Sequence, residues 1–188
     1  MTFPDHGLHT ARLHLRRASL ADAPALLAYQ SRNRAHLLEW EPRRDEAFFT
    51  LAATRQRLHE MEMQMQAQQA LHLLFARTAD TSAAIAGVCH FSNIVRGPFQ
   101  ACHLGFSVDA QEQGQGLMHE ALSCAIEFVF GELHLHRIMA NYRPENRRSA
   151  ALLRKLHFEP EGKARAYLKI NGSWADHILS ARINEAMD

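Results

Sequence analysis

The sequence predicts a mixed α/β fold built on one central sheet. Apolar and amphipathic runs follow the order strand, helices, three strands, helix, strand, helix and two strands, which gives about seven strands, mostly antiparallel, flanked by crossover helices. The chain has 188 residues, 47% of them hydrophobic, which is enough to bury a core in a single domain over residues 1–188. No internal repeat, linker or low-complexity tract divides it.

The first part of the chain predicts one strand and several helices. Apolar and polar residues alternate over 11–19, which is typical of a strand. Asp22 is a candidate N-cap for the first helix, and a second helical piece over 36–41 ends before a proline. Residues 46–68 contain neither Gly nor Pro, so they predict one continuous helix.

The rest of the chain predicts the remainder of the sheet and two more helices. Three apolar or alternating runs, separated by the turn-rich pieces ADTS and RGPF, predict an antiparallel meander over 71–78, 84–95 and 101–108. The later segments are a helix over 117–129, a strand over 136–142, a helix over 146–158, and a hairpin of 166–170 and 174–183 around Asn171-Gly172.

Composition excludes several classes of function. Lys and Arg number 21 against 20 Asp and Glu, so the formal charge of +1 creates no global attraction for nucleic acid or a membrane surface. Three distant cysteines form no disulfide framework, and the first residues lack a secretory signal, so we expect a cytoplasmic protein. His134 and His136 flank Leu135 in a predicted strand, and neither HExxH nor CxxC occurs, so we expect no metal site.

A glycine-rich turn carries the clearest functional signal. Gly114 and Gly116 follow an apolar strand and directly precede a helical segment, where unpaired N–H groups and the helix dipole favour an anion. Glycine there leaves room for a phosphate or permits a positive φ, although a plain loop can also carry Gly-x-Gly. His119 replaces the third glycine of the dinucleotide fingerprint and no Gly-Lys-Ser/Thr follows, which excludes Rossmann and P-loop sites.

Two motifs resemble those of the GNAT N-acetyltransferases. Gln111-x-x-Gly114-x-Gly116 is similar to the Gln/Arg-x-x-Gly-x-Gly/Ala pyrophosphate loop of that family, and the stretch from Asn146 to Phe158 is similar to its Asn-x-x-Ser/Ala…Leu-Gly-Phe segment. Nearly the whole chain resembles the branch of this family that acetylates the N-terminal amine of ribosomal proteins. The stretches that carry this resemblance are RLHLRRASLAD, LLEWEPRRDE, HFSNIVRGPFQACHLGFSV, GQGLMHEAL, HRIMANYRPENRRS and NGSWADH. The resemblance implies the GNAT fold and acetyl-CoA as acyl donor.

The resemblance also implies residues that bind the cofactor. The pyrophosphate would lie on the amides of Gln113, Gly114, Gln115, Gly116, Leu117 and Met118. The backbone from Phe106 to Val108 would pair with the pantetheine arm like a short added strand, with the Val108 N–H as oxyanion donor. Asn146 would contact the pantetheine arm, although Asn at that position is an equally good N-cap.

The proton-transfer groups are less well defined. Many relatives use a Tyr seven residues after that Asn to protonate the thiolate, but this chain has Leu153 there, so the resemblance assigns the thiolate contact to Ser149. Ser149 as a helix-surface residue without a role is the alternative. Ala166 replaces an acid that relatives can carry before the Tyr-Leu pair, which leaves as candidate bases Glu41, His103, Asp176 or a water molecule.

The predicted function is acetylation of a protein N-terminal amine by acetyl-CoA. The expected acceptor is a ribosomal protein that begins with Ala or Ser, with ribosomal protein S5 as one candidate. Acetylation of a small amine is the alternative, and a non-catalytic acyl-CoA-binding module is a third reading. In that module Arg143, Arg147 and Arg148 would touch RNA instead of the 3′-phosphate of CoA or solvent. The oligomeric state, monomer or homodimer, stays open.

Overall fold

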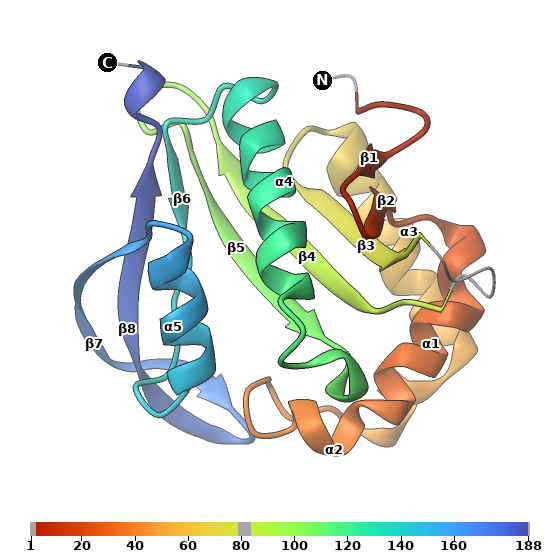
Figure 1. The fold of residues 1–188 in the computed structure, drawn as a ribbon. Coiled ribbons are helices and arrows are strands. Elements are labelled where there is room, and N and C mark those ends of the chain that lie inside the picture. Colours follow the sequence, from red (N-terminus) through yellow and green to blue (C-terminus); the bar gives the residue numbers. More distant parts are fainter. Residues whose placement is uncertain (1–2, 79–83, 188) are drawn as a thin grey trace.

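The computed structural model describes residues 3–78 and 84–187, and its strands form a single sheet of eight (Figure 1). The strands lie in the order β1-β2-β3-β4-β5-β6-β8-β7, and only β5 and β6 pair in parallel. Their bounds are β1 Leu8–His9, β2 Leu13–Arg17, β3 Leu71–Arg77, β4 Gly87–Val95, β5 Ala101–Val108, β6 Arg137–Met139, β7 Glu159–Ile170 and β8 Ser173–Ile183. The predicted mixed, mostly antiparallel sheet is therefore confirmed, and β1 is the strand that the sequence did not reveal.

Helices cover both faces of this sheet. The α-helices are α1 Ala23–Arg32, α2 Arg34–Leu37, α3 Leu51–Gln66, α4 Leu117–Gly131 and α5 Arg147–Lys155, and the short 3-10 turns are η1 Leu20–Asp22, η2 Glu46–Phe49, η3 Ala110–Glu112 and η4 Glu185–Met187. Helices α4 and α5 lie on one face, and α1 and α3 lie on the other (Figure 1). No helix among residues 3–78 and 84–187 is long and apolar enough to cross a membrane.

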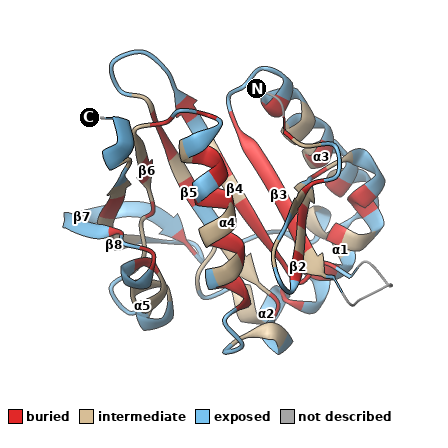
Figure 2. Cartoon of the chain, turned by 45° about the horizontal axis from the view of Figure 1, so that its top comes forward, coloured by how far each residue is buried: buried red, intermediate tan, exposed pale blue. Residues whose placement is uncertain are grey.

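Burial follows from this layering, because the inner strands must be apolar on both faces. In β4, Cys89 and Phe91 belong to the larger core under α4, whereas Val88 belongs to a second core with Leu58 of α3 and Leu26 of α1. Figure 2 shows most of β3 buried and the edge strand β7 largely exposed. The sheet is thus buried in the middle and open to solvent at the β7 edge.

The sheet splits beside β5, and this split positions the site. β5 pairs with β6 only over Ala101–Cys102–His103, opposite Arg137 to Met139. The remainder of β5, up to Val108, keeps β4 on one side but has no partner strand on the other among the described residues. Its free N–H and C=O groups are available to an extended ligand.

The continuous helix predicted over 46–68 is wrong. The segment forms η2, breaks at Thr50, and then forms α3. Thr50 has extended backbone angles (φ −117°, ψ 153°), and its Oγ1 accepts a hydrogen bond from the Ala53 N–H, so it acts as an N-cap in the middle of the segment. Asp45 caps η2 through the Phe48 N–H in the same way.

Three other boundaries differ from prediction. The strand predicted over 136–142 is limited to β6, because beyond Met139 the pairing with β8 is interrupted and Tyr142 forms only an isolated bridge with Ile178. The second helical piece, α2, lies earlier than 36–41, and β7 begins earlier than residue 166. The predicted turn ADTS is residues 79–82, which lie outside the described residues.

Candidate active site

The glycine turn connects β5 to α4 and has the backbone that glycine permits. Gly114 has φ +75° and Gly116 has φ +78°, and Gly116 is the N-cap of α4. A Cβ added to Gly114 would meet no described heavy atom within 4 Å, and one on Gly116 would lie 3.6 Å from Arg12 Nη2. Protein packing therefore does not require glycine here, whereas the positive φ of both residues favours it.

A buried hydrogen-bond network ties the start of this turn to α1. Asn33, between α1 and α2, accepts a hydrogen bond from the Ala110 N–H (2.9 Å) and donates one to Asp109 Oδ2 (3.0 Å). Asp109 also accepts from the Gln111 N–H (2.9 Å) and pairs with Arg32. Burial raises the pKa of Asp109, but the bonds from Asn33, Gln111 and Arg32 outweigh it and hold the pKa below its ordinary value.

Two more arginines brace the other side of the turn. Arg12, before β2, pairs with Glu120 in the first turn of α4 and donates from Nη1 to the Gln115 carbonyl (2.9 Å). Arg77 pairs with Glu112 (2.7 Å). The side chain of Gln115 is drawn into this pair, since its Nε2 donates to Glu112 Oε2 (3.1 Å), so Gln115 offers only its backbone to a ligand.

A continuous cleft of about 2990 Å³ runs past the turn and along the open edge of β5. It is lined by every residue assigned to the cofactor except Gln115: Phe106, Val108, Gln113, Gly114, Gly116, Leu117, Met118, Asn146 and Ser149. Pockets for a single drug-sized ligand are usually about 300–1,000 Å³, so this cleft has room for a long cofactor and a second substrate. The structure thus brings together residues that are distant in the sequence.

The start of α5 forms one wall of this cleft. Asn146 Oδ1 accepts a hydrogen bond from the Ser149 N–H (3.0 Å), so Asn146 is an N-cap that also faces the cleft. The Ser149 hydroxyl makes no hydrogen bond within the described part of the chain, which leaves it available to a ligand. Arg148 donates to Gln113 Oε1, and Arg143 and Arg147 line the same cleft.

At the opposite end of α5, His157 stands where the family's Leu-Gly-Phe segment has glycine. His157 has φ +62°, its N–H donates to the Arg154 carbonyl (3.1 Å), and the Phe158 N–H donates to the Leu153 carbonyl (2.9 Å). These two bonds are those of a Schellman motif, and Leu153 and Phe158 are both buried in the core. The histidine therefore adopts the left-handed conformation in which glycine is the usual residue.

Glu41 lies in the part of the cleft nearest α1 and α2. Burial raises the pKa of its carboxyl, and Arg44 only partly opposes this rise. The Glu41 carbonyl accepts a hydrogen bond from the Asn171 N–H (3.0 Å), which joins this segment to the β7–β8 hairpin. Close by, the Tyr29 hydroxyl hydrogen-bonds Ser107 Oγ (2.9 Å), and burial raises the pKa of Tyr29 above its ordinary value.

The other two candidate bases do not line the cleft. His103 lies on β5, its pKa is lowered by burial, and its Nδ1 is buried without a partner among the described residues. Asp176 pairs with Lys163 (2.8 Å) and accepts from the Ala166 N–H (2.9 Å), which fixes the irregular turn of β7 where Ala166 has φ +47°. Those two bonds lower the pKa of Asp176, with Lys163 the larger cause.

Several residues of the site gave no local signal in the sequence. Arg12 and Tyr29 reach the cleft only because the strand and helix that carry them fold beside it. Asp109 is the exception, because an Asp directly after a strand is a common cap, and it caps η3 through the Gln111 N–H. Among residues 3–78 and 84–187, no group of three or more His, Cys, Asp or Glu side chains could hold a metal ion.

A family model described as the acetyltransferase (GNAT) domain matches residues 12–159. The chain belongs to the GNAT acetyltransferases. It is 43% identical over 178 residues to the [ribosomal protein uS5]-alanine N-acetyltransferase of Escherichia coli, which covers 95% of this chain and 91% of the relative. As a GNAT member it is an acetyl-CoA-dependent N-acetyltransferase, and its α/β GNAT fold is the one predicted.

Solved GNAT structures agree with the model over almost its whole length. The crystal structure of the ribosomal-protein-S5-alanine acetyltransferase from Vibrio fischeri superposes with a TM-score of 0.92 at 38% identity, covering 98% of this chain and all 100% of that one. RimJ from Mycobacterium smegmatis, solved in complex with CoA-disulfide, superposes with a TM-score of 0.87 at 26% identity, covering 93% of this chain and 83% of that one. CoA is thus bound in a homologous GNAT structure.

Proposed function

We propose that this GNAT enzyme acetylates the N-terminal α-amine of a ribosomal protein, with the alanine of ribosomal protein S5 as the favoured acceptor. The names of the relatives from Escherichia coli and Vibrio fischeri support this acceptor. The carrying observation in the structure is that one cleft is lined by the glycine turn, Ser149 and Glu41 together. A cofactor site and an amine site that meet in one cleft are what acyl transfer needs.

In this proposal the cofactor lies along the open edge of β5. The pyrophosphate lies on the N–H groups of the glycine turn, and the pantetheine arm pairs with the free edge from Phe106 to Val108. The Val108 N–H stabilises the oxyanion that develops on the thioester carbonyl. Arg148 lies beside Gln113 of the turn, where its charge suits a phosphate of the cofactor.

The proton transfers use residues on the two sides of the cleft. Glu41, as a carboxylate, accepts a proton from the ammonium form of the acceptor, directly or through water. The free amine then attacks the thioester carbon, and the carbon–sulfur bond breaks. The extra proton on the new amide nitrogen passes to the departing thiolate through the Ser149 hydroxyl, which donates its proton to the sulfur and regains one from the nitrogen, directly or through water. An α-amine has a pKa of about 7.7–8.0, so a weak base is sufficient near neutral pH.

Mass spectrometry of purified enzyme with acetyl-CoA tests this function. The substrates are an Ala-initiated peptide, the same peptide with a blocked α-amine and an internal Lys, and a panel of small amines. We expect one acetyl group on the free α-amine and none on the blocked peptide. Acetylation of small amines with no peptide product would support the small-molecule alternative, and binding of CoA without any turnover would support a non-catalytic module.

A further inference from the structure

A pair of arginines around Phe48 lies in the cleft on the same side as Glu41. The Arg44 guanidinium carbon is 4.7 Å from the centre of the Phe48 ring, and that of Arg57 is 3.7 Å from it. Both arginines line the cleft. A shared cation–π contact holds the two positive charges near one another although they repel.

Neither arginine has an acidic partner. Within 4.0 Å, no described carboxylate pairs with Arg44 or Arg57, whereas nearby Arg34 pairs with Glu46 and Arg32 with Asp109. Arg57 donates only to neutral oxygens, those of Phe48 O (3.1 Å), Gln30 Oε1 (2.8 Å) and Thr54 Oγ1 (3.0 Å). Its Nε is buried and finds no acceptor among the described residues.

Two nearby acids, Asp45 and Glu60, already accept hydrogen bonds from other groups. Asp45 caps the Phe48 N–H (3.0 Å), and Glu60 accepts from Gln56 Nε2 (2.9 Å). The pKa of Arg57 is lowered, first by burial and then by the charge of Arg44, and Glu60 offsets this only in part. Arg57 is half-buried with an unpaired Nε, and Arg44 is exposed beside it, so an incoming carboxylate would relieve the repulsion between the two charges and give that Nε an acceptor.

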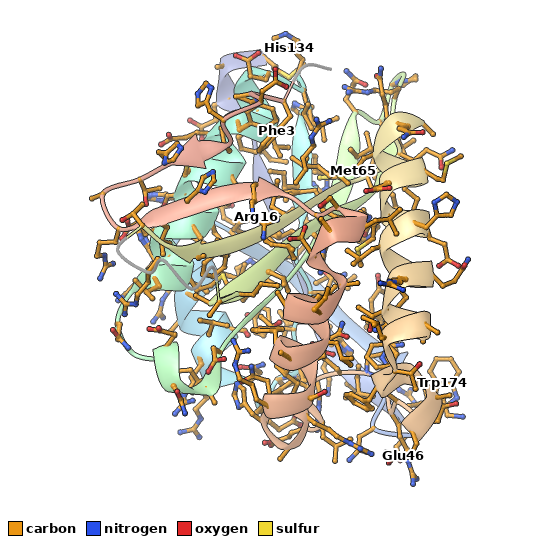
Figure 3. All side chains as sticks on the ribbon, turned by 90° about the vertical axis from the view of Figure 1, so that its right-hand side faces the viewer. Phe3, Arg16, Glu46, Met65, His134 and Trp174 are labelled. Atoms are coloured by element: carbon orange, nitrogen blue, oxygen red, sulfur yellow. The ribbon has the colours of Figure 1, made fainter. Side chains whose placement is uncertain are left out.

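The position of the pair favours the acceptor over the cofactor. The charges of Arg44 and Glu41 influence one another, and those of Glu41 and Tyr29 do so in turn, while Tyr29 hydrogen-bonds Ser107 beside Val108. These residues connect the open edge of β5 to the part of the cleft that Glu41 and Arg44 line. Figure 3 shows Glu46, two residues after Arg44, at the same end of the molecule as Trp174 of the β7–β8 hairpin.

We propose that Arg44 and Arg57 form a subsite for an acidic side chain that follows the N-terminal amine of the acceptor polypeptide. The inference rests on the proposed function and deepens it, because it names a property of the acceptor sequence. An extended chain advances at most about 3.3–3.6 Å per residue. We therefore expect the residue that contacts Arg44 and Arg57 to be one of the first few after the amine.

The test compares Ala-initiated peptides that carry a single Glu or the isosteric Gln at each of positions two to five. We expect one position at which the Glu peptide has about tenfold higher kcat/KM, mainly through KM, because a hydrogen bond to a charged group is stronger than one to a neutral amide even after screening by salt. Arg44→Gln and Arg57→Gln should abolish that preference. Arg55→Gln, an exposed arginine on the same helix, should keep it.

Two further measurements keep the outcomes separate. Calorimetric titration of the Glu and Gln peptides into the CoA-bound enzyme measures peptide affinity even if no acetyl group is transferred. Loss of turnover therefore counts against the proposed function alone. Arg44→Glu should reverse the preference toward a Lys peptide, and Arg57→Lys should keep part of it if Arg57→Gln unfolds. Equal affinity for Glu and Gln peptides at every position would overturn the subsite, as would a raised KM for acetyl-CoA in Arg44→Gln with no change for the peptides.

Discussion

At the residue scale, removal of the Ser149 hydroxyl tests the thiolate contact that the family resemblance assigns to this serine. Its N–H is used by the Asn146 cap, but its hydroxyl is free and faces the cleft. Because a bond to the departing thiolate strengthens as charge develops, Ser149→Ala should lower kcat by about 10²-fold with little effect on acetyl-CoA affinity. Ser149→Thr, which keeps a hydroxyl, is the matched control. Near-full kcat of the Ala variant in single-turnover measurements would assign the proton to water.

Glu41 leads to a second prediction, on pH dependence. Because burial raises its pKa, the carboxylate needed as a base forms only at a higher pH than for an exposed Glu. The kcat/KM of the wild type should therefore fall on the acid side with two ionisations, those of Glu41 and the amine, and Glu41→Gln should retain only that of the amine. An unchanged acid limb in Glu41→Gln would exclude Glu41 as the base.

The raised pKa of Glu41 also predicts that this residue lowers the stability of the fold at neutral pH. A carboxyl whose pKa is raised on folding favours the folded state only while it is protonated, so that contribution declines as the pH rises through the ordinary Glu value of about 4.3. Glu41→Gln should consequently have a higher Tm than the wild type at pH 7 and a similar Tm at pH 4. Thermal unfolding at the two pH values measures the difference.

At the element scale, the N-terminus of α4 depends on two glycines with positive φ. Gly116→Glu places a carboxylate beside the N–H groups assigned to the pyrophosphate, so calorimetry should detect no acetyl-CoA binding while circular dichroism shows a folded protein. Gly114→Ala is the matched control for backbone strain, because its Cβ meets no described atom within 4 Å. Unchanged cofactor affinity in Gly116→Glu would remove the turn from the site.

The end of α5 gives a prediction that concerns stability alone. His157 adopts φ +62° in a Schellman motif whose usual residue is glycine. His157→Gly should raise the free energy of unfolding in urea by about 0.5–1 kcal/mol, because glycine adopts this conformation without steric cost. Arg154→Gly, within the same helix, should lower it by about 1 kcal/mol.

At the scale of the whole molecule, Asn33 links the α1 and α2 side to the turn that begins α4. It is 1% exposed, and its amide satisfies both the Ala110 N–H and Asp109. Asn33→Ala leaves these buried groups short of partners, so the free energy of unfolding should fall by about 2 kcal/mol. Because the same bonds position the turn, the KM for acetyl-CoA should also rise. A loss of stability without any change in KM would show that the link is structural only.

Local signals were sufficient for most elements. The apolar or alternating runs in 71–78, 84–95 and 101–108, the amphipathic pattern of α4 and the Asn171-Gly172 turn are each local signals of secondary structure. Such signals can be recognised from neighbouring residues alone. The break at Thr50 was not predicted, because Thr is tolerated within a helix and becomes a cap only when the preceding chain must turn. β1 is too short to carry a periodic pattern.

The sequence by itself determined the mixed α/β fold, the glycine turn before α4 and, through its resemblance to GNAT motifs, the use of acetyl-CoA. These features are encoded in neighbouring residues, whose spacing reflects backbone geometry. Only the tertiary structure decided that Glu41 lies in the cleft while His103 and Asp176 do not, that Asn33 and Arg12 hold the turn from distant elements, and that Arg44 and Arg57 share Phe48. Such contacts depend on strand order and helix packing, which bring together residues whose separation along the chain carries no information about their distance in space.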